Sequence, residues 1–370
     1  MTPAVSAEPA LTTALIGSYT EPLGHTVGGG PGIVMVRIDH EGRITPVGEA
    51  AAIRNPSYIS VNATGDRAYA SSEITDFNGG HDGGITVLAV DAERNKLEII
   101  QQVGSRGVGP AWVRFSHDGQ HLLVANYLAG NAAVFPVEDD GRLGNPTAVL
   151  QHVGHGPITS RQEAPHPHAA LTSPDGRWLY VLDLGIDEII GYGLSEAGTA
   201  ERIDTAGIEL PGGTGPRHAV WSADGCFLYV GCELSSEITV LRQDTQSGAL
   251  SVEQVLPSFI SDMTDNADNH PSEIALSPDG RHIVIANRGR DTLAVFRVDP
   301  PTGRLIGVSE TPTGLTPRHF TFSGPSQLIL AEQEAHRVTS FRFDSASGDL
   351  SPTGHACEIP SPCFVCPLPG

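Results

Sequence analysis

The chain has 370 residues and a formal net charge of −21, and it is rich in glycine (43) and proline (28). An acidic balance of this size argues against a nucleic-acid partner or an anionic membrane surface. Since no apolar stretch reaches the roughly 18 residues of a membrane span and the N-terminus lacks a signal-peptide pattern, we expect no membrane contact and a cytoplasmic location.

A repeated pattern of short β-rich runs organises the chain. Its anchor is a proline about every 51 residues, the period of a four-stranded blade. The seven anchors are Pro56, Pro110, Pro167, Pro216, Pro271, Pro317 and Pro362. Each of the first six precedes an apolar run and a turn such as Ser-Pro-Asp-Gly, followed by three further runs. The Asp-Gly pairs are residues that tight hairpin turns require.

The two ends of the chain are incomplete in complementary ways. The N-terminal part has runs for the second, third and fourth strands of a blade but none for the first, whereas SPCFVCPL near the C-terminus is an unpaired first strand. Pairing these ends would close the ring and protect its sheet edges. We therefore predict an all-β, seven-bladed propeller in a single domain spanning 1–370, with residues 1–12 as an extended tail.

The irregular segments and the cysteines give weaker signals. The Gly-rich segments 20–32 and 74–84 lack Gly-Lys-Ser/Thr, so we predict loops between second and third strands on one face, not phosphate loops. Cys363 and Cys366 form a lone C-x-x-C, which we interpret as buried strand thiols. His166 and His168 have no third ligand at a suitable spacing, so we expect no metal site.

Residues that follow the repeat prolines are expected to meet the ends of the second strands, because the two strands form a hairpin. These positions should surround one mouth of the central channel. His168, Arg217, Glu233 and Arg288 come from three consecutive repeats and are more polar than packing requires. Polar clusters at a channel mouth are typical of binding sites. We predict these four as catalytic residues, and we predict as substrate-binding residues Arg318, His218, Asn126, Asp183 and Asn287.

Structural interpretations of the same residues stay open at this point. Arg217 and Glu233 could form a buried ion pair across the hairpin, and His168 could be a rim histidine bonded to a backbone carbonyl. Arg318 with His319 repeats the Arg-His pair and fits either a site edge or a salt bridge. No nucleophile elbow, His-Glu-x-x-His or Walker A motif is present. An enzyme with these residues would use acid/base and electrostatic catalysis on a small anion.

Several segments together resemble a known family. NPSYISV, GPAWVRFSHDGQHLLVANY, PHPHAALTSPDGRWLYVLDLG, GTGPRHAVWSADGCFLYVGCELSS, SEIALSPDGRHIVIANRGRDTLAVF and TPRHFTF are similar to successive blades of the lactonase propellers. That family includes bacterial propeller-type 6-phosphogluconolactonases and fungal carboxy-cis,cis-muconate cyclases. The resemblance implies a seven-bladed fold, no cofactor and a lactone reaction, and its His, Arg, Glu and Arg site residues fall on His168, Arg217, Glu233 and Arg288. Cys232 stands where the family commonly has Asn.

The leading hypothesis is hydrolysis of 6-phosphogluconolactone to 6-phosphogluconate. Glu233 or His168 would be the general base, Arg217 would stabilise the oxyanion, and Arg288, with Arg318, would hold the phosphate. A muconate-type cyclisation, hydrolysis of another sugar lactone and a non-catalytic binding module are the alternatives. We expect a small anionic lactone as the partner and a monomer or weak homo-oligomer.

Overall fold

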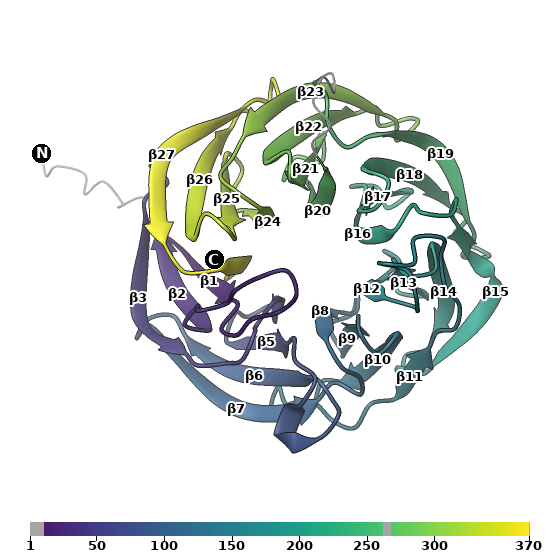
Figure 1. Ribbon diagram of the computed structural model, residues 1–370, viewed down its shortest axis with the longest axis horizontal. Coiled ribbons are helices and arrows are strands. Elements are labelled where there is room, and N and C mark those ends of the chain that lie inside the picture. The colour runs from purple at the N-terminus through teal and green to yellow at the C-terminus, as the bar shows by residue number, and fades with distance from the viewer. Residues whose placement is uncertain (1–10, 262–267, 370) are drawn as a thin grey trace, which may run out of the picture.

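The strands form seven four-stranded antiparallel sheets arranged as blades around a central axis (Figure 1). The structure, a computed structural model, describes residues 11–261 and 268–369. This arrangement confirms the predicted seven-bladed propeller. Within the described residues the single helical element is a short 3₁₀ helix, η1 (Phe77–Gly79), and no helix there is long and apolar enough to cross a bilayer.

Six blades are each built from consecutive strands. Two of them contain β4 (Ile59–Val61), β5 (Arg67–Ser72), β6 (Gly84–Asp91) and β7 (Lys96–Gly104), then β8 (Pro110–Phe115), β9 (His121–Asn126), β10 (Asn131–Pro136) and β11 (Ala148–Gln151). The next two contain β12 (Pro167–Thr172), β13 (Trp178–Asp183), β14 (Glu188–Leu194) and β15 (Ala200–Glu209), then β16 (Pro216–Trp221), β17 (Phe227–Cys232), β18 (Glu237–Gln243) and β19 (Leu250–Pro257). The last two contain β20 (His270–Leu276), β21 (His282–Arg288), β22 (Thr292–Val298) and β23 (Leu305–Pro312), then β24 (Pro317–Phe322), β25 (Gln327–Glu332), β26 (Arg337–Phe343) and β27 (Leu350–Glu358).

The seventh blade joins both ends of the chain, as the sequence predicts. Its strand order is β28 (Pro362–Pro367), β1 (Thr12–Ser18), β2 (Ile33–Ile38) and β3 (Ile44–Ala51). β1 and β28 pair antiparallel, with Ala14 opposite Pro367 and Gly17 opposite Phe364. Thr12 already belongs to β1, so the predicted tail of residues 1–12 is wrong at that residue, and residues 1–10 lie outside the described part.

The apolar core lies between neighbouring blades. The middle strands are buried on both faces, for example all six residues of β9 and of β17, whereas the outer β7 is mostly exposed or half-buried. The indole Nε1 of Trp112 donates a 2.9 Å hydrogen bond to the Ala170 carbonyl, which links β8 to β12. Sheets buried on both faces explain why the middle runs read as continuous apolar sequence.

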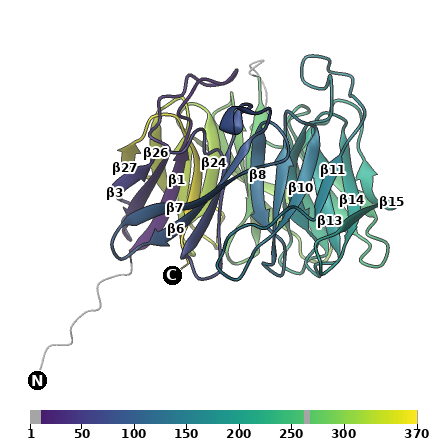
Figure 2. The ribbon, with the colours of Figure 1, turned by 90° about the horizontal axis from the view of Figure 1, so that it is seen from below.

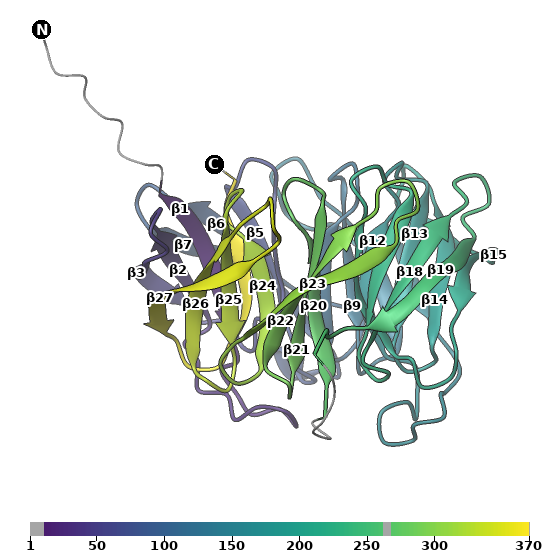
Figure 3. The same ribbon diagram turned by 90° about the horizontal axis from the view of Figure 1, so that it is seen from above.

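The long loops lie on one face of the ring, and β1 begins and β28 ends at the opposite face (Figures 2 and 3). The Gly-rich segments 20–32 and 74–84 connect second and third strands, as predicted. Residues 152–166 and the described part of 258–269 instead connect one blade to the next. Because neighbouring strands run antiparallel, the end of a second strand and the start of a first strand lie on the same face. The loops between second and third strands and the loops between blades therefore meet on that face.

Candidate active site

A cavity of about 390 Å³ lies at the face that carries the long loops, because residues of those loops line it. Its walls come from the starts of first strands, the ends of second strands and the loops between them. The lining residues are Leu23, Gly24, His25, Ser57, Tyr58, Glu73, Ala111, Tyr127, Leu128, Arg161, His168, Arg217, His218, Glu233, Arg288, Arg318, His319, Cys363 and Phe364. The cavity thus occupies the predicted mouth of the channel.

A repeated irregularity of the first strands aims side chains into this cavity. On β12, β16 and β24 the strand register shifts between the proline and the second residue after it. The shifts isolate His168, Arg217 and Arg318 from the regular pairing. Such β-bulges re-aim side chains and are common beside active sites. The residue after each proline therefore faces the cavity because it is the bulged residue.

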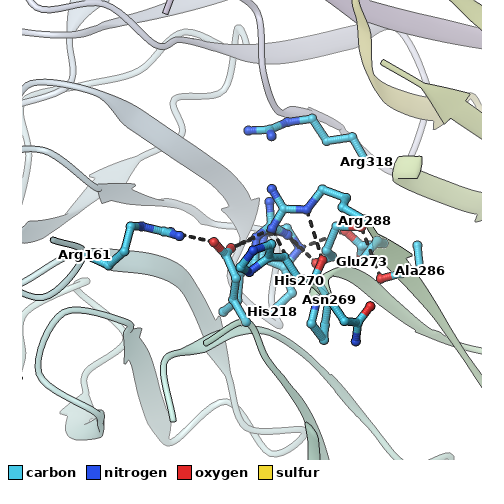
Figure 4. Close-up of polar contacts among 12 residues, drawn as sticks. Arg161, His218, Asn269, His270, Glu273, Ala286, Arg288 and Arg318 are labelled. Carbon is cyan, nitrogen blue, oxygen red and sulfur yellow. Dashed lines mark hydrogen bonds and ion pairs between the residues drawn. The ribbon is translucent and has the colours of Figure 1, made fainter. Parts of the chain in front are cut away.

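Glu233 is the centre of the charged cluster. Its Oε2 lies 2.9 Å from Nε of Arg217 and 2.8 Å from Nη2 of Arg288, and its Oε1 lies 2.5 Å from Nη2 of Arg161. In Figure 4, Arg161 and Arg288 approach one carboxylate from opposite sides. The predicted Arg217–Glu233 ion pair is therefore present, within a group of three arginines around one carboxylate.

Backbone carbonyls hold two of these arginines. Nη1 of Arg217 donates to the Ser272 carbonyl of the next blade. Arg288 donates from Nε to the His270 carbonyl at 3.2 Å and from Nη2 to the Pro271 carbonyl at 3.4 Å. These contacts fix each guanidinium plane before any substrate arrives, which is the condition for electrostatic preorganisation.

Burial and mutual charge set the protonation states. Burial opposes ionisation of Glu233, but Arg288, Arg217 and Arg161 outweigh it, so the pKa of the carboxyl lies well below its ordinary value. Burial and, to a smaller extent, the charge of Arg288 lower the pKa of Arg217 to about 9. Burial, with Arg217, also lowers the pKa of His168 well below its ordinary value. Near pH 7 the site holds an ionised Glu233 and a neutral His168.

Arg318 stands apart from this cluster. Its Nη2 donates a 2.7 Å hydrogen bond to the hydroxyl of Tyr19, which donates a 2.9 Å hydrogen bond to Oε2 of Glu73. Within the described residues no carboxylate lies within ion-pair distance of Arg318. In Figure 4, Arg318 lies apart from the dashed contacts that join the other side chains drawn. Arg318 is therefore a cation available to an anionic ligand.

A buried layer closes the cavity toward the channel interior. Oε2 of Glu273 lies 2.8 Å from Nδ1 of His218 and 3.3 Å from Nε2 of His319. Burial raises the pKa of Glu273 to about 8 and lowers the pKa values of both histidines well below their ordinary range. Nη1 of Arg217 lies 3.2 Å from Nδ1 of His218, so this layer supports the charged cluster from within.

Comparison with known proteins agrees with this geometry. Residues 13–367 match the family model described as lactonase, 7-bladed beta-propeller. This chain belongs to the lactonase family of β-propellers. It is 32% identical over 354 residues to a 6-phosphogluconolactonase of Bacillus subtilis (strain 168), with 95% of this chain and 96% of the relative covered. The family resemblance and the prediction of a lactone-hydrolysing enzyme are thereby confirmed.

Two further relatives of this lactonase-family chain are informative. A 6-phosphogluconolactonase of Formosa agariphila is 25% identical over 312 residues and covers 82% of this chain and 85% of its own length. A solved structure of a Pseudomonas aeruginosa periplasmic gluconolactonase has a TM-score of 0.89 and 30% identity, with 97% and 99% of the two chains covered. The names of these relatives thus include both phosphorylated and unphosphorylated sugar lactones.

Six of the nine predicted residues line the cavity of this lactonase-family propeller. They are His168, Arg217, Glu233, Arg288, Arg318 and His218. His168 could have been a rim histidine bonded to a backbone carbonyl. Its Nδ1 is instead buried without a hydrogen-bond partner among the described residues, so no such bond is present at this nitrogen. The four predicted catalytic residues are therefore neighbours in one cavity wall, although their roles stay predictions.

Asn126, Asp183 and Asn287 do not line the cavity, which corrects their predicted place in the substrate site. The Asn126 amide donates to the Ser105 carbonyl, and the Asn287 amide donates to the Ser258 carbonyl. Asp183 accepts from the backbone nitrogen of His166 at 2.6 Å and lies 2.6 Å from Nδ1 of His152. All three side chains are fully buried and hold the ends of loops.

Several residues of the cavity and of the buried layer beneath it are absent from the sequence-based prediction. Arg161, in the loop between β11 and β12, and His25, in the loop between β1 and β2, line the cavity. Glu273, two residues after a repeat proline, belongs to the buried layer. The repeat register carries no signal for the two loop residues. The length of those loops, on the predicted face, was the available indication.

Cys363 and Cys366 agree with their interpretation as buried strand thiols. All five cysteines are free, and Cys363 and Cys366 are buried on β28. Burial raises the pKa values of both thiols, which leaves them protonated and unreactive near pH 7. Across residues 11–261 and 268–369, no group of three or more His, Cys, Asp or Glu side chains is placed to hold a metal ion.

Proposed function

We propose that this protein hydrolyses 6-phosphogluconolactone to 6-phosphogluconate. The observation that carries the proposal is the charge of the cavity. Four arginines and two glutamates line it, an excess of two positive charges in a protein of net charge −21. The lining histidines, with lowered pKa values, add no charge near neutral pH. A phosphate monoester carries close to two negative charges at pH 7 and matches this excess.

Hydrolysis of the lactone requires stabilisation of one developing negative charge. A water oxygen attacks the carbonyl carbon, and the carbonyl oxygen becomes an oxyanion. Arg217 is the best placed donor for that oxygen, because its guanidinium is fixed by Glu233 and the Ser272 carbonyl. A prepositioned donor of this kind costs no reorganisation during the reaction.

Proton transfer completes the reaction without a covalent enzyme intermediate. The attacking water gives a proton to Glu233 or to neutral His168, the bond between the carbonyl carbon and the ring oxygen breaks, and the ring oxygen takes a proton to become a hydroxyl. The new carboxylic acid then ionises. Neutral His168 is in the protonation state that a general base needs, and Glu233 is ionised.

The arginines differ in their capacity to hold a phosphate. Arg288 is committed to Glu233 and two backbone carbonyls. Arg318 contacts only Tyr19 among the polar side chains of the described residues and has donors left for a ligand. We therefore assign the main phosphate contact to Arg318, with Arg288 as its neighbour, because guanidinium groups bind phosphate through parallel hydrogen bonds.

Hydrolysis of an unphosphorylated sugar lactone is the second candidate, and the structural likeness to a gluconolactonase favours it. Initial rates on 6-phosphogluconolactone, gluconolactone and carboxymuconolactone, each corrected for spontaneous hydrolysis, separate the candidates. We expect kcat/KM to be highest for the phosphorylated lactone. No turnover of any lactone would overturn the proposal, and a preference for gluconolactone would replace it with the second candidate.

We further propose a single domain over 1–370, a cytoplasmic location and a monomer or weak homo-oligomer. Size-exclusion chromatography with light scattering measures the oligomeric state directly.

A further inference from the structure

Both oxygens of the central carboxylate are covered before substrate binds. Oε2 of Glu233 contacts Arg217 and Arg288, and Oε1 contacts Arg161. The Glu233 side chain is only 5% exposed. For Glu233 to accept a proton from water, one of these contacts has to be given up. The question is which arginine leaves most easily.

Arg161 is held differently from the other two arginines. Arg217 and Arg288 are 3% and 16% exposed, and both donate to backbone carbonyls, Arg217 in the next blade and Arg288 within its own blade. The Arg161 side chain is 37% exposed, and its guanidinium is held by the side chains of Glu233 and Tyr127. A partly exposed ion pair between side chains exchanges partners at little cost.

The backbone beneath Arg161 is fixed, so its side chain is the part that can move. The neighbouring Gln162 is fully buried, and its amide donates a 2.9 Å hydrogen bond to the Leu184 carbonyl. The Gln162 amide oxygen accepts from the backbone nitrogen of Ile158 at 3.1 Å. A long side chain on a pinned loop can change partner by rotation about its own bonds, without movement of the loop.

We propose that Arg161 is a specificity residue that covers Oε1 of Glu233 until an anionic group of the substrate draws it away. The phosphate of the substrate takes the Arg161 guanidinium, and Oε1 becomes free to bind the attacking water and accept its proton. The proton then passes to the ring oxygen as the ring bond breaks, so Glu233 is regenerated. This inference rests on the proposed lactone hydrolysis and adds to it a substrate-dependent release of the base.

The charge balance supports this exchange. A phosphate dianion that enters this cavity, which has two excess positive charges, has to pair with arginines. The arginines available to it are those that the carboxylates of the protein hold weakly. Arg318 has no carboxylate partner among the described residues. Of the three arginines that pair with Glu233, Arg161 has the most exposed side chain. When Arg161 leaves, one of the three cations that lower the pKa of Glu233 is removed, so the carboxylate becomes a stronger base.

The test compares Arg161→Gln with the wild type on two substrates that differ only in the phosphate. Removing Arg161 should lower kcat/KM for 6-phosphogluconolactone about tenfold, the loss of one charge-assisted contact. It should raise kcat/KM for gluconolactone a few-fold, because Oε1 is no longer covered. Arg202→Gln is the matched control, since Arg202 lies on β15, is half exposed and pairs with Glu188 outside the cavity.

A second measurement uses phosphite dianion as a detached phosphate. Added phosphite should accelerate gluconolactone hydrolysis by the wild type and by Arg202→Gln. It should not accelerate hydrolysis by Arg161→Gln, in which the group that it draws away is absent. Arg161→Lys should restore part of the phosphite response, because a lysine keeps the charge but lacks the fork of donors.

The outcomes separate this inference from the proposed function. A wild type that hydrolyses no lactone overturns both. Equal losses on the two lactones in Arg161→Gln would show a structural role only, and a raised KM for the phosphorylated lactone with no gain on gluconolactone would show a plain phosphate contact. Either result would overturn the covering role of Arg161 and leave the lactone hydrolysis standing.

Discussion

Arg217-His218 and Arg318-His319 are the same dipeptide at the same place in two blades, directly after the proline of a first strand. A β-bulge turns both arginines into the cavity. Their environments nevertheless differ. Arg217 pairs with a carboxylate, and burial lowers its pKa to about 9. For Arg318, burial opposes the charge, but Tyr19 and Glu73 outweigh it and raise its pKa.

The difference comes from the neighbouring second strand. The second strand beside Arg217 is followed by Glu233, whereas the one beside Arg318 is followed by Gln333, whose amide donates to the His25 carbonyl. One arginine is thus tied into a charged cluster, and the other keeps donors for a ligand. A repeated motif supplies the position of a side chain, and the residue across the hairpin decides its chemistry.

The largest effect is expected from Arg217→Ala. If Arg217 stabilises the oxyanion, its loss should lower kcat/KM for 6-phosphogluconolactone about 10³-fold, as for removal of one oxyanion donor. The fall should appear in kcat for every lactone. Circular-dichroism melting of the variant checks that it folds, and normal turnover in a folded variant would remove Arg217 from the mechanism.

Arg318→Gln should have a smaller and more selective effect. Loss of the Arg318 guanidinium should lower kcat/KM for 6-phosphogluconolactone about 30-fold, mainly through KM, because a charge-assisted contact to the phosphate is lost. The loss on gluconolactone should be only about twofold, since that substrate has no phosphate to bind. Steady-state kinetics on both lactones measure the contrast, and equal losses would contradict a phosphate-binding role.

Glu273 joins the two pairs, because His218 and His319 both contact its Oε2. Burial raises its pKa from 4.5 to about 8. Between these values the folded chain keeps a proton that the unfolded chain releases, so the free energy of unfolding falls as pH rises, by at most about 1.4 kcal/mol per pH unit. Glu273→Gln cannot titrate and should lack this slope.

Urea unfolding of wild type and Glu273→Gln at pH 5, 6.5 and 8 measures this difference. The stability of the wild type relative to the variant should decrease steadily across the series. A constant difference would mean that Glu273 has an ordinary pKa in the folded protein.

The smallest effect is expected from Tyr19→Phe. The change removes the hydroxyl that accepts from Arg318 and donates to Glu73, but it keeps the aromatic ring beside the guanidinium, whose central carbon lies 5.1 Å from the ring centroid. Loss of one hydrogen bond of about 1 kcal/mol should raise KM for the phosphorylated lactone about fivefold. A change in kcat instead would place Tyr19 in the reaction itself.

The fold could be predicted because its signals are local and repeated. The proline spacing, the Asp-Gly turns and the two incomplete ends together specify seven blades and their closure, and Gly225 with φ of +73° confirms the turn geometry at one of these sites. The same repetition predicted the place of the cavity, since in most blades the residue after the repeat proline lines it. Position within a repeat is therefore readable from sequence.

The errors have equally local causes. Asn126 and Asn287 each precede a cavity-lining residue, Tyr127 and Arg288, and successive side chains of a strand point to opposite faces. Adjacency in sequence was therefore a poor guide to the substrate site. Arg161 could not be predicted, because it lies in a blade-to-blade loop outside the strands of the repeat and its contact with Glu233 spans 72 positions.

The closure of the ring has a consequence for the synthesis of this protein. β28 supplies Cys363 and Phe364 to the cavity and pairs with β1, which leads into the Tyr19 that holds Arg318. A chain that stops before Pro362 lacks this wall and leaves an unpaired edge on β1. Six complete blades and three strands of the seventh thus precede a working site, and a nascent chain should gain activity only after β28 has left the exit tunnel.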